Sequence, residues 1–161
     1  MNRLYYSNNA IQQLSIARNN KLELLRLDRE LSSIQTNIFI LQLKGVDRTE
    51  LQNLQLKVHG VDNSRDQIIC AITNGIYMAI DNAIKAMRLS MQGDNYSMIM
   101  LDDHMLQNIA SFINEYYKND EIKQAIKNRI RFSHISYSIM QLGFNSKYFM
   151  PGLMSLQNIL R

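Results

Sequence analysis

Chemically reactive residues are few and widely spaced in this chain of 161 residues. The three histidines, His59, His104 and His134, lie in separate segments, and Cys70 is the single cysteine. Zinc and helical di-iron sites use closely spaced ligands, as in paired cysteines, His-Glu-x-x-His or Glu-x-x-His, and none of these patterns occurs. The sequence also has no glycine-rich phosphate-binding loop. We therefore expect a protein that is not an enzyme and that needs no cofactor or metal.

Asp102, Asp103 and His104 are the one cluster of potential metal ligands. Three adjacent residues on a helix point in different directions, so the cluster is poorly arranged to hold one ion. Acidic residues are favoured in the first turn of a helix, where they interact with its dipole. We interpret the two aspartates in that way. Ser133 and His134 are neighbours in sequence, but a nucleophilic triad is defined by its three-dimensional geometry, which the sequence does not give.

Cys70 lies between apolar neighbours, which favours a packed side chain over a reactive thiol, and it has no partner for an internal disulfide. The first ten residues lack the apolar run of a signal peptide. The longest apolar run in the chain, residues 68–72, is far too short to cross a bilayer. We expect a soluble, cytoplasmic protein that does not insert into membranes.

The strongest structural signal is one long, mostly buried helix from Asp66 to Gln92. Its apolar residues recur at steps of three and four, as the face of an α-helix requires. They are Ile68, Ile69, Ile72, Ile76, Ala79, Ile80, Ala83, Ile84, Met87 and Met91. Only one proline and six glycines interrupt the chain, and alternating strand patterns are short. The prediction is an all-α bundle of five or six helices.

A long N-terminal helix is predicted to begin near Ser7, Asn8 or Asn9 and to continue to Leu43. Its second half has a heptad seam, which is typical of a helical hairpin or a coiled-coil arm. We favour the hairpin, and we keep the seam as a candidate protein-interaction surface. In the first half Ala10, Ala17 and Asn20 occupy the seam, so weaker packing or a stutter in the heptad register is expected there. The seam residues are Leu24, Leu27, Leu31, Ile34, Ile38 and Leu41.

Two similar tripeptides follow, Gly45-Val46-Asp47 and Gly60-Val61-Asp62. Glycine can end a helix in the left-handed conformation, and aspartate can cap the next one. Each tripeptide therefore predicts a helix break, with a short helix of residues 48–59 between them. On this basis we expect a single helical domain, 1–161, made of an N-terminal hairpin or arm (1–59) and a bundle (62–161).

Three further helices are predicted toward the C-terminus. The first follows a turn at Gly93, Asp94 and Asn95, begins at Ser97 or Leu101 and ends at Tyr117. The second extends from residue 119 or 120 to Gln141, and Leu142-Gly143-Phe144 ends it. The third covers residues 151–160 and has a proline in its first turn.

The net charge of +4 is concentrated in the C-terminal third. From Lys118 onward there are seven basic and two acidic residues, against 11 basic and 12 acidic in the first 117. Clustered lysine and arginine can bind phosphates, so a small nucleic-acid-binding regulator is our alternative hypothesis. Its candidate binding residues are Lys123, Lys127, Arg129 and Arg131.

A short segment resembles the second helix-turn-helix of AraC-type regulators. The matching residues are Ile135, Leu142-Gly143-Phe144-Asn145-Ser146 and Tyr148-Phe149. The segment departs from that pattern at Pro151, which falls where the family's recognition helix continues, and no first helix-turn-helix precedes it. We transfer no functional residues from this resemblance.

Our main hypothesis is a non-enzymatic helical module that binds another protein or itself, as an adaptor, a chaperone or an assembly component. The chain has more apolar helix faces than one small bundle obviously uses. Methionine-rich segments add adaptable apolar surface. Besides the seam, the candidate interaction residues are Met98, Met100, Phe149 and Met150.

Overall fold

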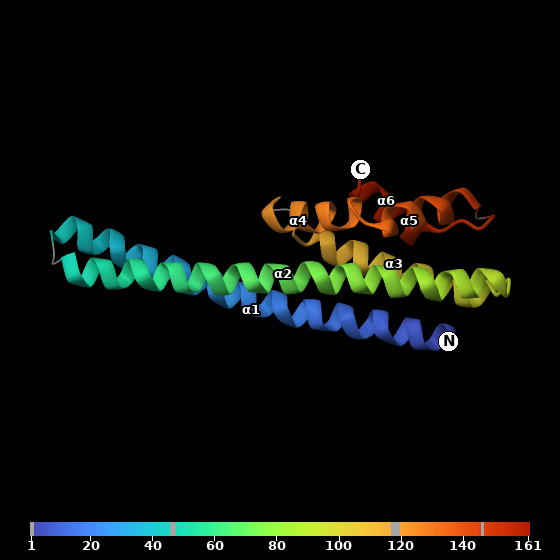
Figure 1. Cartoon of the computed structure of the whole chain (residues 1–161), viewed down its shortest axis with the longest axis horizontal. Helices are drawn as coiled ribbons and strands as arrows, with labels where there is room; N and C mark the ends of the chain where they lie inside the picture. The colour runs from blue at the N-terminus through green and yellow to red at the C-terminus, as the bar shows by residue number, and fades with distance from the viewer. Residues whose placement is uncertain (1, 46–47, 117–119, 146) are drawn as a thin grey trace. The chain divides into compact units, whose positions relative to one another are not determined.

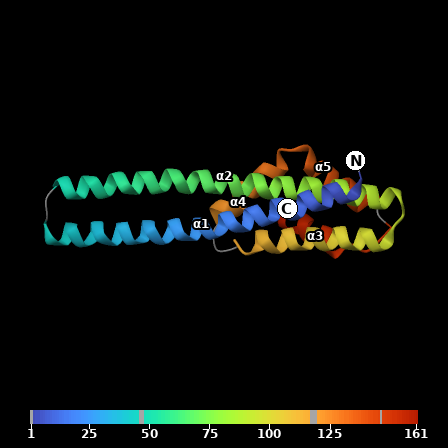
Figure 2. The same ribbon diagram turned by 90° about the horizontal axis from the view of Figure 1, so that it is seen from below.

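Residues 3–44, which contain no glycine or proline, form one long helix. A computed structural model describes residues 2–45, 48–116, 120–145 and 147–161, and over these residues the chain is built from six α-helices without a strand (Figures 1 and 2). The predicted all-α fold with a long N-terminal helix is confirmed. The helices are α1 (Arg3–Lys44), α2 (Arg48–Gln92), α3 (Tyr96–Asn114), α4 (Asp120–Arg131), α5 (His134–Asn145) and α6 (Pro151–Ile159).

Helix α1 begins earlier than predicted. The side chain of Asn2 accepts a hydrogen bond from the backbone N–H of Tyr5 at 3.0 Å, so Asn2 caps the helix, and the predicted caps at residues 7–9 were wrong. At its other end α1 stops at Gly45, which has a φ of +66°. Glycine adopts this left-handed conformation at little cost, as predicted. The predicted cap at Asp47 lies outside the described residues.

Helix α2 continues through the second Gly-Val-Asp tripeptide, so the predicted break at residues 60–62 was wrong. Val61 is buried in the hydrophobic core that α2 forms with α1, together with Leu27 and Ile34. A glycine inside a helix costs about 1 kcal/mol relative to alanine, and burial of a side chain such as that of Val61 recovers a similar or larger amount. Tertiary packing therefore overrides the local helix-ending signal.

The predicted helix of residues 119–141 is two helices. α4 ends at Arg131, and α5 begins at His134. The hydroxyl of Ser133 donates a hydrogen bond to the carbonyl oxygen of Ile130 at 2.7 Å. Serine side chains compete in this way for the carbonyls that a continuous helix would use. Gly143 lies inside α5, so the turn required by the resemblance to a helix-turn-helix is not formed there.

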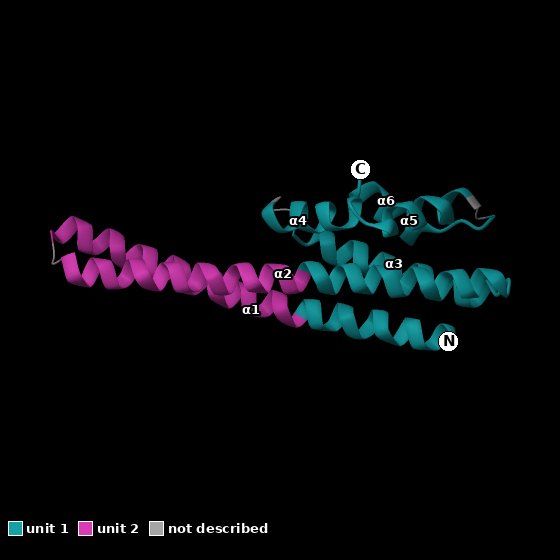
Figure 3. Cartoon of the chain, in the orientation of Figure 1, with its two compact units in different colours: residues 1–18, 73–161 teal, residues 19–72 magenta. Residues whose placement is uncertain are grey.

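The described chain divides into two compact units, residues 19–72 and residues 1–18 with 73–161 (Figure 3). These boundaries differ from those predicted for the arm (1–59) and the bundle (62–161). The unit of residues 19–72 is a helical hairpin made of parts of α1 and α2. Its core is formed by Leu27, Ile34 and Val61 with Leu31, Ile38, Leu54, Val58 and Ile68 packed against it.

In the unit of residues 1–18 and 73–161, α2 and α3 lie between α1 on one side and α4 to α6 on the other (Figure 1). Ala10 and Ala17 of α1 are completely buried. A Cβ atom placed on Gly75 of α2 would lie 3.4 Å from the Cβ of Ala17, so the two helices approach closely. The small seam residues therefore allow close packing, and the prediction of weak packing there was wrong.

Candidate protein-interaction surfaces

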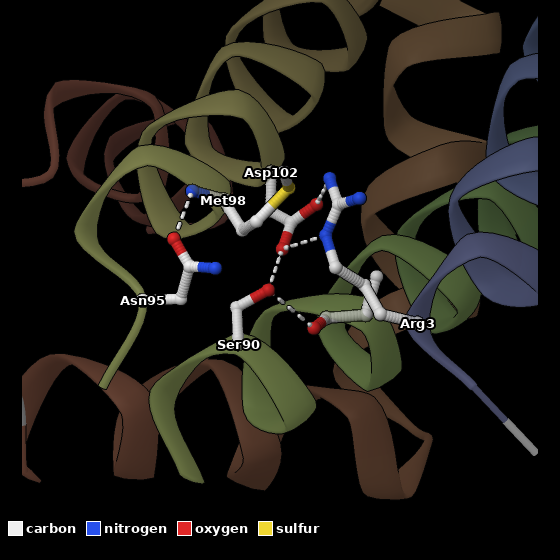
Figure 4. A network of polar contacts seen from close by, with 6 residues as sticks. Arg3, Ser90, Asn95, Met98 and Asp102 are labelled. Carbon is white, nitrogen blue, oxygen red and sulfur yellow. Dashed lines mark hydrogen bonds and ion pairs between the residues drawn. The ribbon is translucent and has the colours of Figure 1, made fainter. Parts of the chain in front are cut away.

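Asp102 is the centre of a buried polar network that joins three helices (Figure 4). Its carboxylate accepts two hydrogen bonds from the guanidinium of Arg3, from Nη2 at 2.6 Å and from Nε at 3.2 Å. The hydroxyl of Ser90 donates a third at 2.7 Å. The side chain of Asp102 is 2% exposed, so its carboxylate has lost its contacts with water. The three hydrogen bonds compensate for that loss. The network fixes α1 and α2 against α3.

Asp103 makes a different contact, at the start of α6. Its two carboxylate oxygens accept hydrogen bonds from the backbone N–H groups of Gly152 at 2.8 Å and Leu153 at 2.9 Å. A carboxylate at a helix N-terminus satisfies free N–H groups and interacts favourably with the helix dipole. Gly152 allows the close approach, because a Cβ atom there would lie 2.0 Å from the main-chain oxygen of Asp103.

The interpretation of these two aspartates as first-turn residues was wrong, because α3 already begins at Tyr96. His104 beside them is exposed. Over the described residues, no group of three or more histidine, cysteine or acidic side chains is placed to hold a metal ion. Their role as buried hydrogen-bond acceptors had one signal in the sequence, the position of two acidic residues inside an otherwise apolar helix. A carboxylate buried there needs hydrogen-bond donors from other segments of the chain.

The predicted heptad seam lies inside the hairpin. Leu24, Leu27 and Ile34 are buried, and Leu31, Ile38 and Leu41 are partly buried. The seam therefore packs within the chain, as the favoured hairpin interpretation requires. The side chains of this seam are thereby largely unavailable to a partner while the hairpin is closed.

The outer side of the hairpin, in contrast, exposes large apolar side chains that are not part of the predicted seam. The exposed apolar residues of α1 lie at heptad positions other than the two that form the buried seam. They form two groups along α1, one at residues 22 and 25 and one at residues 39–43, with exposed polar residues between them. Clustered exposed apolar side chains such as those of residues 39–43 mark candidate protein contacts. The exposed residues are Leu22, Leu25, Phe39, Ile40 and Leu43 on α1 and Leu56 on α2.

The other predicted interaction residues have different environments. Met98 and Met100 are partly buried, and Met150 is buried. Phe149, next to it, is 74% exposed. Of these four residues, Met150 therefore belongs to the core, Met98 and Met100 are partly accessible, and Phe149 has the most exposed side chain.

The basic residues of α4 have structural contacts. Arg131 Nε donates to the carbonyl oxygen of Leu160 at 3.2 Å, and Lys127 Nζ lies 3.4 Å from the main-chain oxygen of Arg161. Cations near the C-terminus of a helix interact favourably with its dipole, so both residues stabilise the end of α6. The guanidinium of Arg129 lies 3.8 Å from the ring centroid of Tyr77. Lys123 borders a polar cleft between α3, α4 and α6.

Helix α5 has two apolar faces, and the core covers one of them. Ile135, Ser138, Ile139 and Leu142 face the core. Tyr137, Met140 and Phe144 follow steps of three and four on the other face, and they are 62%, 49% and 81% exposed. Because these three side chains are exposed, the second face of α5 lacks a neighbour within the described chain.

A groove of about 530 Å³ lies where this second face meets α6. Both helices belong to the same compact unit, and they pack against each other. The residues around the groove are Ser136, Ile139, Met140, Gly143 and Phe144 of α5 with Gln157, Leu160 and Arg161. Sequence reasoning missed this site, although the spacing of Tyr137, Met140 and Phe144 was visible.

Over the described residues the protein is all-α and contains a helical hairpin. Its exposed apolar side chains include those on the outer side of the hairpin and on the second face of α5. No described helix combines the length and the apolar character needed to cross a membrane. No protein-family model matches the sequence, and no curated protein or solved structure shows significant similarity to it.

Proposed function

We propose that this chain is a non-enzymatic, cytoplasmic protein-interaction module that acts as an adaptor, a chaperone or an assembly component. The observation that carries the proposal is the second apolar face of α5, on which Phe144 is 81% exposed beside a groove. Exposed aromatic side chains next to a groove are typical anchors of protein interfaces. The exposed outer side of the hairpin supports a second contact, with another protein or with another copy of the chain.

Site-specific photocrosslinking tests the proposal. A benzophenone amino acid is placed at Phe144, and, as a matched control, at Ser111, which is exposed on α3. In the native host we expect defined protein adducts from position 144 and none from position 111. Equal, diffuse labelling from both positions, or no adduct from either together with a strictly monomeric protein in sedimentation, would contradict the proposal.

The alternative function, nucleic-acid binding by α4, is supported by the concentration of positive charge in the C-terminal third. Arg131 contacts a carbonyl group and Arg129 an aromatic ring, so neither charge is neutralised by these contacts. Retention on immobilised DNA or RNA should then fall with increasing salt and with charge reversal at Lys127, Arg129 and Arg131. Circular dichroism controls for folding, because two of these residues contact the end of α6. Unchanged retention removes α4 from consideration.

A further inference from the structure

The groove between α5 and α6 has an apolar floor and one basic end. Ile139, Met140 and Phe144 contribute apolar surface from α5, and Leu160 contributes it from the end of α6. Ser136 and Gln157 supply polar edges. No acidic side chain is among the residues that line this groove. Its ligand should therefore present an apolar ridge and should tolerate, or prefer, a cationic neighbour.

Positive charge is gathered around the Leu160 end of the groove. Arg161 lines it, and Arg131 reaches the same end through its hydrogen bond to Leu160. The sequence from residue 122 to residue 161 contains six lysines and arginines and no aspartate or glutamate. Electrostatic complementarity sets partner choice and association rate at such surfaces. An acidic partner is favoured, and a basic one is repelled.

The length of the groove suits a helix as ligand. Its lining on α5 extends from Ser136 to Phe144. That length is about 13 Å, or two and a half helical turns. Amphipathic helices bind such grooves through apolar residues at positions i, i+3 or i+4, and i+7. The flexible side chain of Met140 can adapt to different apolar residues of a ligand. Phe144, at the same face, offers a large ring surface as an anchor.

We propose that this groove binds an acidic amphipathic helix of a partner protein. The apolar ridge of that helix lies against Met140 and Phe144, and its carboxylates face Arg161 at the basic end. This inference rests on the proposed interaction function and adds the chemistry of the partner to it.

Fluorescence anisotropy with the full chain and two labelled synthetic helices tests the proposal. Both peptides have about 16 residues with leucine at positions i, i+3 and i+7, and the remaining positions carry mostly glutamate in one and lysine in the other. We expect the acidic peptide to bind at least about tenfold more tightly than the basic one, and its affinity to fall with salt. Phe144→Ser and Met140→Ser should each weaken acidic-peptide binding by about tenfold.

Leu101→Ser is the matched control, because Leu101 is an exposed apolar residue of α3 outside the groove. It should leave the affinity unchanged. Equal binding of both peptides, or insensitivity to Phe144→Ser, would overturn the proposal. Displacement of the acidic peptide by a labelled oligonucleotide that binds in its place would assign the basic end to nucleic acid instead. If the acidic peptide fails to bind while crosslinking at position 144 succeeds, the partner chemistry is wrong but the interaction function stands.

Discussion

Arg3, at the start of α1, forms a two-point ion pair with Asp102, which lies 99 residues away in the middle of α3. The closer of the two contacts, between Nη2 and Oδ1, is 2.6 Å long. Planar guanidinium and carboxylate groups match each other in such pairs, which are stronger than single neutral hydrogen bonds. This ion pair and the hydrogen bond from Ser90 are what allow an aspartate to lie inside an apolar helix.

Arg3→Ala should destabilise the protein strongly, because it leaves the Asp102 carboxylate buried without its counter-charge. Removal of one partner of a buried pair costs about 3–5 kcal/mol, and the partial exposure of Arg3 reduces the expected loss to roughly 2–4 kcal/mol. Urea denaturation measures this change in the free energy of unfolding. Arg26→Ala is the matched control, since Arg26 pairs with Glu23 and Glu30 on the exposed surface of α1. A similar loss in both variants would contradict the buried role of Arg3.

Asp103→Ala should loosen the start of α6. The substitution removes the acceptor for two backbone N–H groups, and loss of a helix cap typically costs about 0.5–2 kcal/mol. Asp103→Asn keeps an acceptor oxygen, so it should cost much less. Amide hydrogen exchange at Gly152 and Leu153 provides the measurement. Equal protection of these amides in the alanine variant and the wild type would argue against the cap.

Gly60→Ala should stabilise the protein by about 0.5–1 kcal/mol, because Gly60 lies inside α2 and open space surrounds the position of its missing Cβ. Gly45→Ala is the contrasting variant. Gly45 has a φ of +66°, so a side chain there is strained, and a loss of about 1 kcal/mol is expected. Thermal unfolding compares the two. A loss of stability in Gly60→Ala would instead support a helix end at that position.

Asp94 links the turn after α2 to the segment before α6. Tyr148 donates a hydrogen bond to its carboxylate, and Lys147 Nζ lies 3.3 Å from it. The Tyr148 hydrogen bond, and then the Lys147 contacts, lower the pKa of Asp94 below its ordinary value. The stabilising effect of this ionised carboxylate is therefore present above the ordinary aspartate pKa, and it is lost as the pH falls through the lowered pKa.

Tyr148→Phe should raise the pKa of Asp94 back toward its ordinary value, because the substitution removes the larger cause of the shift. Carbon-detected NMR titration of the carboxyl group measures the change. Lys147→Met should produce a smaller rise in the pKa of Asp94. An unchanged pKa in the Tyr148→Phe variant would show that the hydrogen bond does not form in solution.

Cys70 should react with a thiol reagent in the folded protein. The sequence predicted a packed side chain, but the structure shows this cysteine exposed on α2, so that prediction was wrong. The expected rate of modification by a coloured disulfide reagent is close to that of the denatured chain. If the thiol of Cys70 reacts much more slowly in the folded protein than in denaturant, its side chain is buried and the prediction is wrong.

The sequence by itself determined the helical class, because the three- and four-residue spacing of apolar residues is a local property of the α-helix. It also predicted the hairpin seam, the turn at residues 93–95 and a last helix beginning at Pro151. The buried residues Ile72, Ile76, Ile80 and Ile84 were recognisable from the same spacing. Each of these features depends on neighbours within one or two turns of the chain.

Tertiary structure alone decided which local signals were overridden and which surfaces stayed open. Gly60 continues a helix because Val61 is buried against α1, and the aspartates of α3 are buried because donors come from Arg3, Ser90 and the start of α6. The spacing of Tyr137, Met140 and Phe144 shows an apolar face, but not whether another helix covers it. Burial and long-range pairing depend on segments that are distant in sequence, and no local pattern records where those segments meet.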